Sequence, residues 1–188
     1  IGRIGGVDGV ALETEKWIAV LERMGHRCSV LSGMLEEAEM PGVTLLEELS
    51  FFHPDTIAEQ RDAFFEQDVE EADLMQSLQA RTQYLVDQIG KWIEQQQIDV
   101  LISENASTIP CHLAMGWALE RVMAERGVPT IVHNHDFYWE RGERYQTRYS
   151  QIAAMVERCF PPRLDNVRHA VINLHGQETL RAKWALDS

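Results

Sequence analysis

The stretch that decides the fold runs from Ile98 to Val132, IDVLISENASTIPCHLAMGWALERVMAERGVPTIV. Its start, Ile98–Ser103, is nearly continuous in apolar residues, as in a strand buried on both faces of a parallel sheet. A helical pattern follows from Pro110 to Arg126, with Gly127 as its stop signal, and another apolar run covers 128–132. Strand, helix and strand in this order predict a βαβ unit with two parallel strands.

The same alternation extends to both sides of this unit. Around it we expect a helix over 8–25, a strand over 27–32, helical structure over 56–97, a helix over 147–159, a strand over 167–174 and a helix over 177–184. The long helical region is either two helices or one with a bend near Gln67, and residues 43–49 fit a strand or a short helix. The pattern predicts an α/β fold, a Rossmann-like three-layer sandwich with a mostly parallel sheet.

Length and composition exclude several classes of protein. The 188 residues are expected to form one domain. With 17 Lys and Arg against 30 Asp and Glu, the net charge of −13 argues against a nucleic-acid or anionic-membrane surface. No run approaches the ~20 apolar residues of a transmembrane helix. The three distant cysteines, Cys28, Cys111 and Cys159, predict no disulfide framework, so we expect a cytoplasmic protein.

Ligands of parallel α/β sheets bind beyond the carboxyl ends of the strands, which directs attention to three segments. The first is the glycine-rich start Gly5-Gly6-Val7, followed by Asp8 as a helix N-cap. Its glycines permit close backbone approach, and the amides of the next helix favour an anion such as a phosphate. A plain tight turn explains the same residues equally well. A strand ahead of Ile1 is also expected, because such a loop leaves from a strand.

The second segment is the strand-end loop over 133–144, which opens with HNHDFYWER. Two histidines, two acids, an arginine and three aromatic residues within nine positions predict a polar pocket with aromatic walls, suited to a sugar. Here His135 would bond hydroxyl groups and Arg141 would pair with an anion, while Arg144 adds positive charge. The alternative is one histidine satisfied in the core and aromatic side chains that fill the loop.

The third segment is Glu104-Asn105, at the end of the strand over 98–103. It is a candidate ligand contact, but capping of the next helix by Asn105 or Ser107 is an equally good explanation. His175 lies between the last strand and the last helix, so it is a further candidate for the same edge of the sheet.

In order and spacing, these motifs resemble the amino-terminal part of retaining glycosyltransferases of the GT-B fold, family 4. The similar stretches are the Gly-Gly-Val loop with LETEKW after it, LERMGHRCSV over 21–30, PTIVHNHD over 129–136 and VIN over 171–173. The resemblance implies that 1–188 is a single acceptor-side domain without its first strand, facing a carboxy-terminal donor domain. It departs from the family pattern at Asn173, where many members have Ser, and at Glu104-Asn105, which replaces a His-rich strand end.

The resemblance also implies roles for individual residues. Catalysis would fall to His135 and Asp136, and the donor phosphates and sugar to Gly5, Gly6 and Val7. Acceptor contacts would come from Glu104, Asn105, His133, Tyr138, Arg141 and Arg144. Such enzymes transfer the sugar on one face, with the leaving phosphate helping to deprotonate the acceptor, so no protein nucleophile is needed. The expected partners are a nucleotide sugar and a small polar or carbohydrate acceptor, with no cofactor and no metal.

Two other functions fit the same residues. One is a metal-dependent hydrolase, in which His133, His135 and Asp136 hold a divalent cation and Glu104 and His175 are the nearest further ligands. The other is a non-catalytic module that binds a sugar or a phosphate without turnover.

Overall fold

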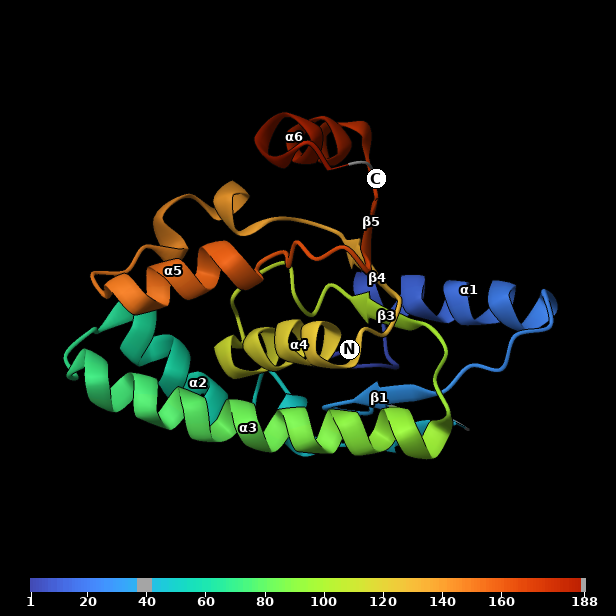
Figure 1. Cartoon of the computed structure of the whole chain (residues 1–188), viewed down its shortest axis with the longest axis horizontal. Helices are drawn as coiled ribbons and strands as arrows, with labels where there is room; N and C mark the ends of the chain where they lie inside the picture. The colour runs from blue at the N-terminus through green and yellow to red at the C-terminus, as the bar shows by residue number, and fades with distance from the viewer. Residues whose placement is uncertain (37–41, 187–188) are drawn as a thin grey trace.

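The protein has parallel strands with helices on both sides, in a computed structural model that describes residues 1–36 and 42–186 (Figure 1). The elements are α1 (Gly9–Arg23), β1 (Val30–Ser32), β2 (Val43–Leu45), η1 (Glu47–Leu49), α2 (Pro54–Gln60), η2 (Arg61–Phe65), α3 (Glu71–Gln96), β3 (Leu101–Glu104), α4 (Leu113–Arg126), β4 (Thr130–Asn134), η3 (Tyr138–Tyr145), α5 (Ser150–Cys159), β5 (Val167–Val171) and α6 (Leu174–Trp184). The predicted Rossmann-like α/β class is confirmed.

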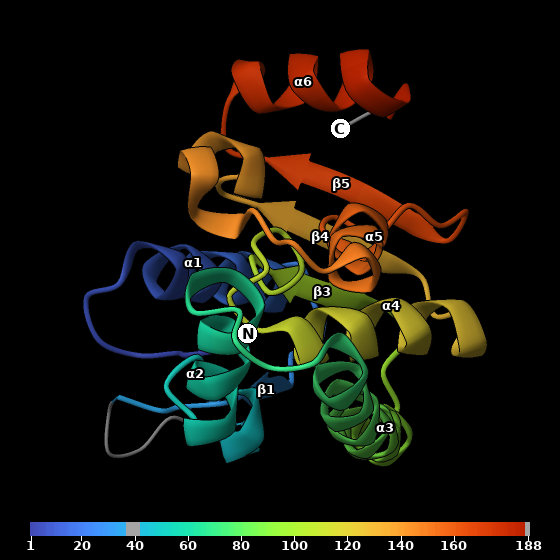
Figure 2. The same cartoon turned by 90° about the vertical axis from the view of Figure 1, so that its left-hand side faces the viewer.

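The strands of the described residues form two parallel groups. β1 pairs with β2, with Val30 opposite Val43, and β3, β4 and β5 form the other group in that order. Within it Glu104 lies opposite His133, so the ends of β3 and β4 meet at one edge. Figure 2 shows β3, β4 and β5 pointing the same way, as the predicted βαβ unit requires.

Several expected boundaries were wrong because side-chain caps set them. The helix expected from Pro110 begins at Leu113, where His112 Nδ1 accepts the amide of Met115 at 3.2 Å. The last strand ends at Val171 rather than 174, because Asn173 Oδ1 accepts the Gly176 amide at 2.8 Å and starts α6. In both cases the helix begins directly after the residue whose side chain accepts a free backbone amide of the first turn.

The structure decides between the alternatives for residues 43–49 and for the long helical region over 56–97. Residues 43–49 contain both alternatives, the strand β2 followed by the single turn η1. The long helical region is two helices, α2 with its π-helical extension η2 and then α3, and Gln67 between them has a left-handed φ of 54°. The expected loop over 133–144 instead begins in β4, which runs to Asn134, and then winds into the 3-10 segment η3.

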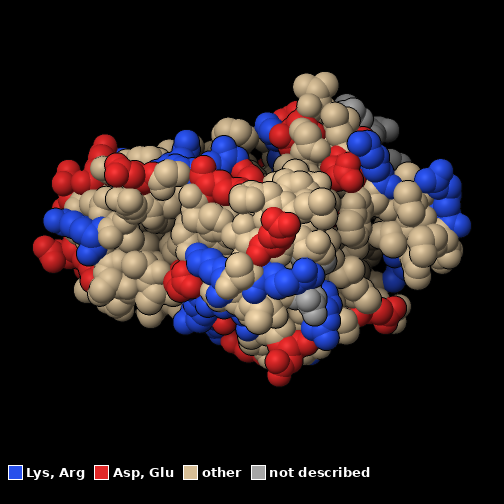
Figure 3. Space-filling view, turned by 90° about the horizontal axis from the view of Figure 1, so that it is seen from above, with Lys and Arg blue, Asp and Glu red and all other residues tan. Residues whose placement is uncertain are grey.

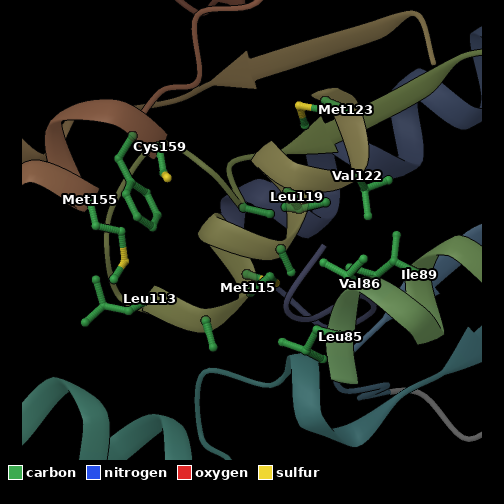
Figure 4. Close-up of a cluster of buried hydrophobic side chains, with 14 of the residues drawn as sticks. Leu85, Val86, Ile89, Leu113, Met115, Leu119, Val122, Met123, Met155 and Cys159 are labelled. Atoms are coloured by element: carbon green, nitrogen blue, oxygen red, sulfur yellow. The ribbon is translucent and has the colours of Figure 1, made fainter. Parts of the chain in front are cut away.

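The hydrophobic core lies between α3, α4, α5 and the sheet. Figure 4 shows Leu85, Val86 and Ile89 of α3 near the side chains of α4, with Met155 and Cys159 of α5 on another side. The three cysteines are free, in line with the prediction of no disulfide framework. The helices of this core support β3 and β4, and the polar groups lie at the carboxyl ends of these two strands.

The charged surface carries both signs. From above, Figure 3 shows Lys and Arg interspersed with Asp and Glu rather than gathered in one field. Among the helices described, none has the length and apolar character to cross a membrane.

Candidate functional site

A buried carboxylate and two imidazoles meet where β3 and β4 end. Glu104 is the last residue of β3, and its Oε2 accepts a hydrogen bond from His133 Nδ1 at 2.8 Å, with both side chains at most 5% exposed. The His133 ring also contacts Trp17 of α1, with ring centroids 4.7 Å apart. A carboxylate that accepts from Nδ1 fixes the orientation of the ring, and the indole covers it.

His135 completes this group from the segment after β4. Its Nε2 is 3.8 Å from the same Glu104 oxygen, and its ring centroid is 4.7 Å from that of His133. Burial opposes ionisation of Glu104, but the two neighbouring imidazoles outweigh it and lower the pKa of this carboxyl. Among the described residues, Glu104 Oε1 and His135 Nε2 find no hydrogen-bond partner, so both atoms can bond to a ligand.

Asn105 joins the ends of the two strands. Its Oδ1 accepts the His135 amide at 3.1 Å, and its Nδ2 donates to Asp136 Oδ1 at 3.2 Å. The capping alternative for this segment was wrong, because His112 caps α4 while Ser107 bonds to Ser103. The left-handed φ of 49° at Asn105 suits a residue type that tolerates this conformation. The side chain therefore holds the two strand-end segments in one arrangement.

Asp136 and Arg141 form an ion pair next to this junction, and Arg141 is half-exposed. Burial raises the pKa of the Cys111 thiol to about 12, against the opposing charges of Arg144 and Arg141. The guanidinium of Arg144 also lies over the Phe65 ring. The segment from Asp136 to Arg144 thus carries one carboxylate that is paired with Arg141 and a second cation at Arg144.

The aromatic residues of this segment pack mainly against helices. Phe137 and Trp139 stack with centroids 4.5 Å apart, and Trp139 meets Trp184 of α6 at 5.3 Å. Tyr138 donates its hydroxyl to Glu157 of α5 at 2.9 Å. For these side chains the structure follows the loop-filling alternative more than the predicted aromatic walls.

The glycine loop is a tight turn with two left-handed residues. Gly5 and Gly6 have φ of 83° and 73°, and a Cβ at Gly6 would collide with the Glu36 carboxylate. Arg3 pairs with both Asp8 and Glu36, at 3.1 and 3.0 Å. Since Ile4 pairs in parallel with Leu35, just beyond β1, the loop lies past the carboxyl end of that strand. Val7, at 92% exposed, projects from it.

The donor atoms that could share a metal ion are not the predicted set. Among the described residues, Glu104, His133 and His135 offer ligand atoms within 4.8 Å of one another. Asp136, expected as the third ligand, pairs with Arg141 instead. The predicted cluster of His133, His135 and Asp136 is therefore replaced by one in which Glu104 takes the place of Asp136.

Sequence reasoning missed two residues that support the site. Trp17 of α1 is one of them, because its indole covers the His133 ring. The buried Asn134 accepts from the Thr108 hydroxyl at 3.0 Å and donates to the Ala170 carbonyl at 3.0 Å, so it ties the segment after β3 to β5. The available signal for Asn134 was an amide side chain at the end of an otherwise apolar strand.

The chain is similar to two curated proteins. It is 30% identical over 189 residues to the mannosylglucosylglycerate synthase of Thermotoga maritima, and 29% identical over 196 residues to that of Petrotoga mobilis. Both alignments cover 99% of this chain and 42% of the relative, so the chain spans about two fifths of the length of these relatives. No protein-family profile and no solved structure matches it.

Proposed function

We propose that this chain is the acceptor-side, amino-terminal domain of a glycosyltransferase of the GT-B type. It would act in transfer of a sugar from a nucleotide sugar to an acceptor hydroxyl, with retention of configuration. The observation that carries the proposal is similarity over 99% of the chain to two synthases whose product name contains mannosyl and glucosyl groups. The polar group at the ends of β3 and β4 supports it, since that edge of a parallel sheet is where ligands bind.

In this proposal His135 contacts the transferred sugar. Its Nε2 has no partner among the described residues and lies in a largely buried position, where a hydrogen bond to a hydroxyl is strong. Asp136, which accepts a hydrogen bond from the Asn105 side chain, acts next to His135. Both groups position and stabilise charge, and the leaving phosphate deprotonates the acceptor, so no protein nucleophile is required.

The donor phosphates lie against Gly5, Gly6 and Val7 in the same proposal. The left-handed turn brings backbone close to the ligand, and the adjacent amino end of α1 favours negative charge. A second domain of the same protein, beyond residue 188, supplies the remaining contacts to the nucleotide. The donor needs no metal, because amides and cations meet the diphosphate charge.

The acceptor is proposed to be a small carbohydrate that carries a carboxylate, as the word glycerate in the relatives' name suggests. Arg141 and Arg144 would bind that carboxylate, since guanidinium groups pair with it through two parallel hydrogen bonds. Contacts to the acceptor hydroxyls would come from Glu104, Asn105, His133 and Tyr138.

The test uses the full-length protein and a panel of nucleotide sugars, with and without EDTA, and follows nucleotide release by mass spectrometry. We expect release from one nucleotide sugar, only when a carboxylated sugar acceptor is present, and unchanged by EDTA. Loss of activity in EDTA would favour a metal at Glu104, His133 and His135. Binding without release from any donor would instead identify a non-catalytic module.

A matched pair of variants connects turnover to the site. His135→Asn removes the free imidazole nitrogen, and we expect turnover to fall about 100-fold, within the range for a positioned acid, base or hydrogen-bond donor. His26→Asn changes an exposed histidine at the far end of α1 and is expected to leave turnover unchanged. Equal activity of the two variants would remove His135 from the reaction.

A further inference from the structure

An arginine beside the glycine turn is held by two carboxylates. Arg3 Nη2 lies 3.1 Å from Asp8 Oδ1, and Arg3 Nη1 lies 3.0 Å from Glu36 Oε1. The guanidinium group also lies over the Phe52 ring, 5.8 Å from its centroid. The three charged side chains are between 27% and 30% exposed, so a ligand in solution can reach them. Arg3 therefore has a defined and accessible place next to the turn.

The two carboxylates are held in different ways. Asp8 is the N-cap of α1, and its Oδ2 accepts the Ala11 amide at 3.2 Å, so the helix depends on its position. Glu36 has its backbone fixed, since its amide donates to Ile4 O at 3.0 Å. Rotation about its side-chain bonds would move the carboxylate away from Arg3 without moving that backbone. Glu36 is thus the partner that Arg3 can exchange.

The Glu36 carboxylate lies directly against the glycine turn. A Cβ at Gly6 would collide with Glu36 Oε2, so the carboxylate fills the space that a side chain would take. The left-handed φ of 73° at Gly6 makes glycine the favoured residue there as well. The turn and Arg3 together therefore already hold one anionic group, and it comes from the protein's own chain.

The charges at this place oppose the binding of a second anion. Two carboxylates, Asp8 and Glu36, face one guanidinium group, so the three side chains carry a net charge of −1. An ion pair between partly exposed groups is only weakly stabilising. A phosphate bonds to a guanidinium group more strongly, through two parallel charge-assisted hydrogen bonds. A phosphate can therefore replace Glu36 on Arg3, whereas binding next to it is unfavourable.

We propose that Glu36 is a built-in competitor for the donor diphosphate and that Arg3 is the group for which the two compete. When the nucleotide sugar binds, a phosphate oxygen takes the place of the Glu36 carboxylate on Arg3 and beside Gly6. This rests on the proposed position of the donor phosphates at Gly5, Gly6 and Val7. The donor affinity is then lowered by the fraction of molecules in which Glu36 holds Arg3. After transfer, the same carboxylate competes with the nucleoside diphosphate and favours its release.

The test titrates inorganic pyrophosphate into the full-length protein by calorimetry, with no sugar present. Glu36→Gln keeps the size of the side chain but removes its charge, and we expect pyrophosphate to bind about tenfold more tightly than in the wild type. The matched control is Glu22→Gln, the same change on an exposed side chain about 20 Å along α1 from Asp8, which should leave the affinity unchanged. Equal affinity of Glu36→Gln and the wild type, or an equal gain in Glu22→Gln, would overturn the proposal.

A double variant tests whether Glu36 acts through Arg3. Arg3→Met is expected to weaken pyrophosphate binding at least about tenfold, and adding Glu36→Gln to it should restore little, because the group under competition is gone. A full gain from Glu36→Gln in the Arg3→Met background would mean that Glu36 acts only by its charge, and would contradict the exchange. If Arg3→Met does not fold, Arg3→Lys replaces it. Lysine keeps the charge without the two-donor edge, and we expect about threefold weaker binding.

The outcomes separate this proposal from the transferase itself. Pyrophosphate binding that follows the expected pattern, with no nucleotide released from any sugar, would support the exchange and overturn the transferase. Nucleotide release with no change of pyrophosphate affinity in Glu36→Gln would support the transferase and overturn the exchange.

Discussion

Glu59 and Glu104 are two buried carboxylates that the fold treats in opposite ways. Glu59, in α2, forms an ion pair of 2.6 Å with Arg81 of α3, yet burial raises its pKa to about 7 against the effect of that guanidinium. Glu104 is equally buried, but the imidazoles of His133 and His135 lower its pKa. At physiological pH the Glu59 carboxyl is divided between its neutral and ionised forms, whereas the Glu104 carboxyl is ionised.

The two carboxylates differ in the residues that they pair with and in whether one of their oxygens is left without a hydrogen bond. Arg81 is permanently charged and connects α2 with α3, so the Glu59 pair fastens two helices together. Glu104 bonds to titratable rings at the edge of the sheet, and its Oε1 has no hydrogen-bond partner among the described residues. Burial of a carboxylate alone therefore does not indicate a functional site. A buried polar atom without a hydrogen-bond partner, at the carboxyl ends of the strands, is a better indicator.

The largest effect is expected from Arg81→Met, which removes the cation from the Glu59 pair. A buried carboxyl left without its partner costs about 3–5 kcal/mol of unfolding free energy. Urea unfolding at pH 7 measures it. The double variant with Glu59→Gln is expected to recover a large part of that loss, and a double variant as unstable as Arg81→Met alone would contradict a coupled pair.

The pH dependence of stability tests Glu59 itself. Its folded pKa of about 7 lies above the ordinary value of 4.5, so its contribution is complete below pH 4.5 and is lost as the pH rises through 7. Between these limits, the unfolding free energy of the wild type should fall by about 3 kcal/mol relative to Glu59→Gln. Urea titrations of both proteins at pH values of about 4.5, 6 and 8 give this difference. A constant difference would mean that folding does not raise the pKa of Glu59.

Glu104→Gln is expected to act on turnover rather than on stability. In the full-length protein we expect a loss of about 100-fold in kcat, because a misdirected His135 is no longer aligned with the reacting sugar. Glu59→Gln is the matched control, because it makes the same change in a buried carboxyl that pairs with Arg81 of α3, and it should change kcat less than about threefold. Equal losses in the two variants would assign both to general destabilisation, which the Tm of each checks.

The smallest effect is expected at Asn105. Asn105→Asp places a second carboxylate against Asp136 in place of the donor that is now 3.2 Å away. We expect about a tenfold loss of kcat, with Asn105→Gly milder because it keeps the left-handed backbone and adds no charge. If Asn105→Asp turns over as fast as the wild type, the link between the two strand ends has no part in turnover.

The sequence predicts the order of elements well because helices and strands differ in apolar spacing. The bend near Gln67 and the βαβ unit are confirmed for that reason. Boundaries were missed where one side chain decides them. His112 is not a preferred capping residue, and Asn173 follows a β-branched run that continues the strand pattern.

The site was only partly predictable. The rule that ligands bind at the carboxyl ends of parallel strands is enough to group Glu104, Asn105 and the 133–141 segment from their positions in the chain. The pairings were not accessible, because nothing local shows that Asp136 meets Arg141 while Glu104 meets His133. Contacts between side chains distant in sequence depend on strand register and on rotamers, which spacing along the chain does not encode.

The aromatic contacts of η3 give the candidate site an optical signal of its own. Trp139 and Trp184 are 5.3 Å apart with their rings at 70°. Two indoles held this close and inclined to one another share their excited states, which adds a paired band to the near-ultraviolet circular dichroism. Since η3 also carries Arg141, a ligand that moves this segment would change that band, and binding can be followed in the unlabelled protein.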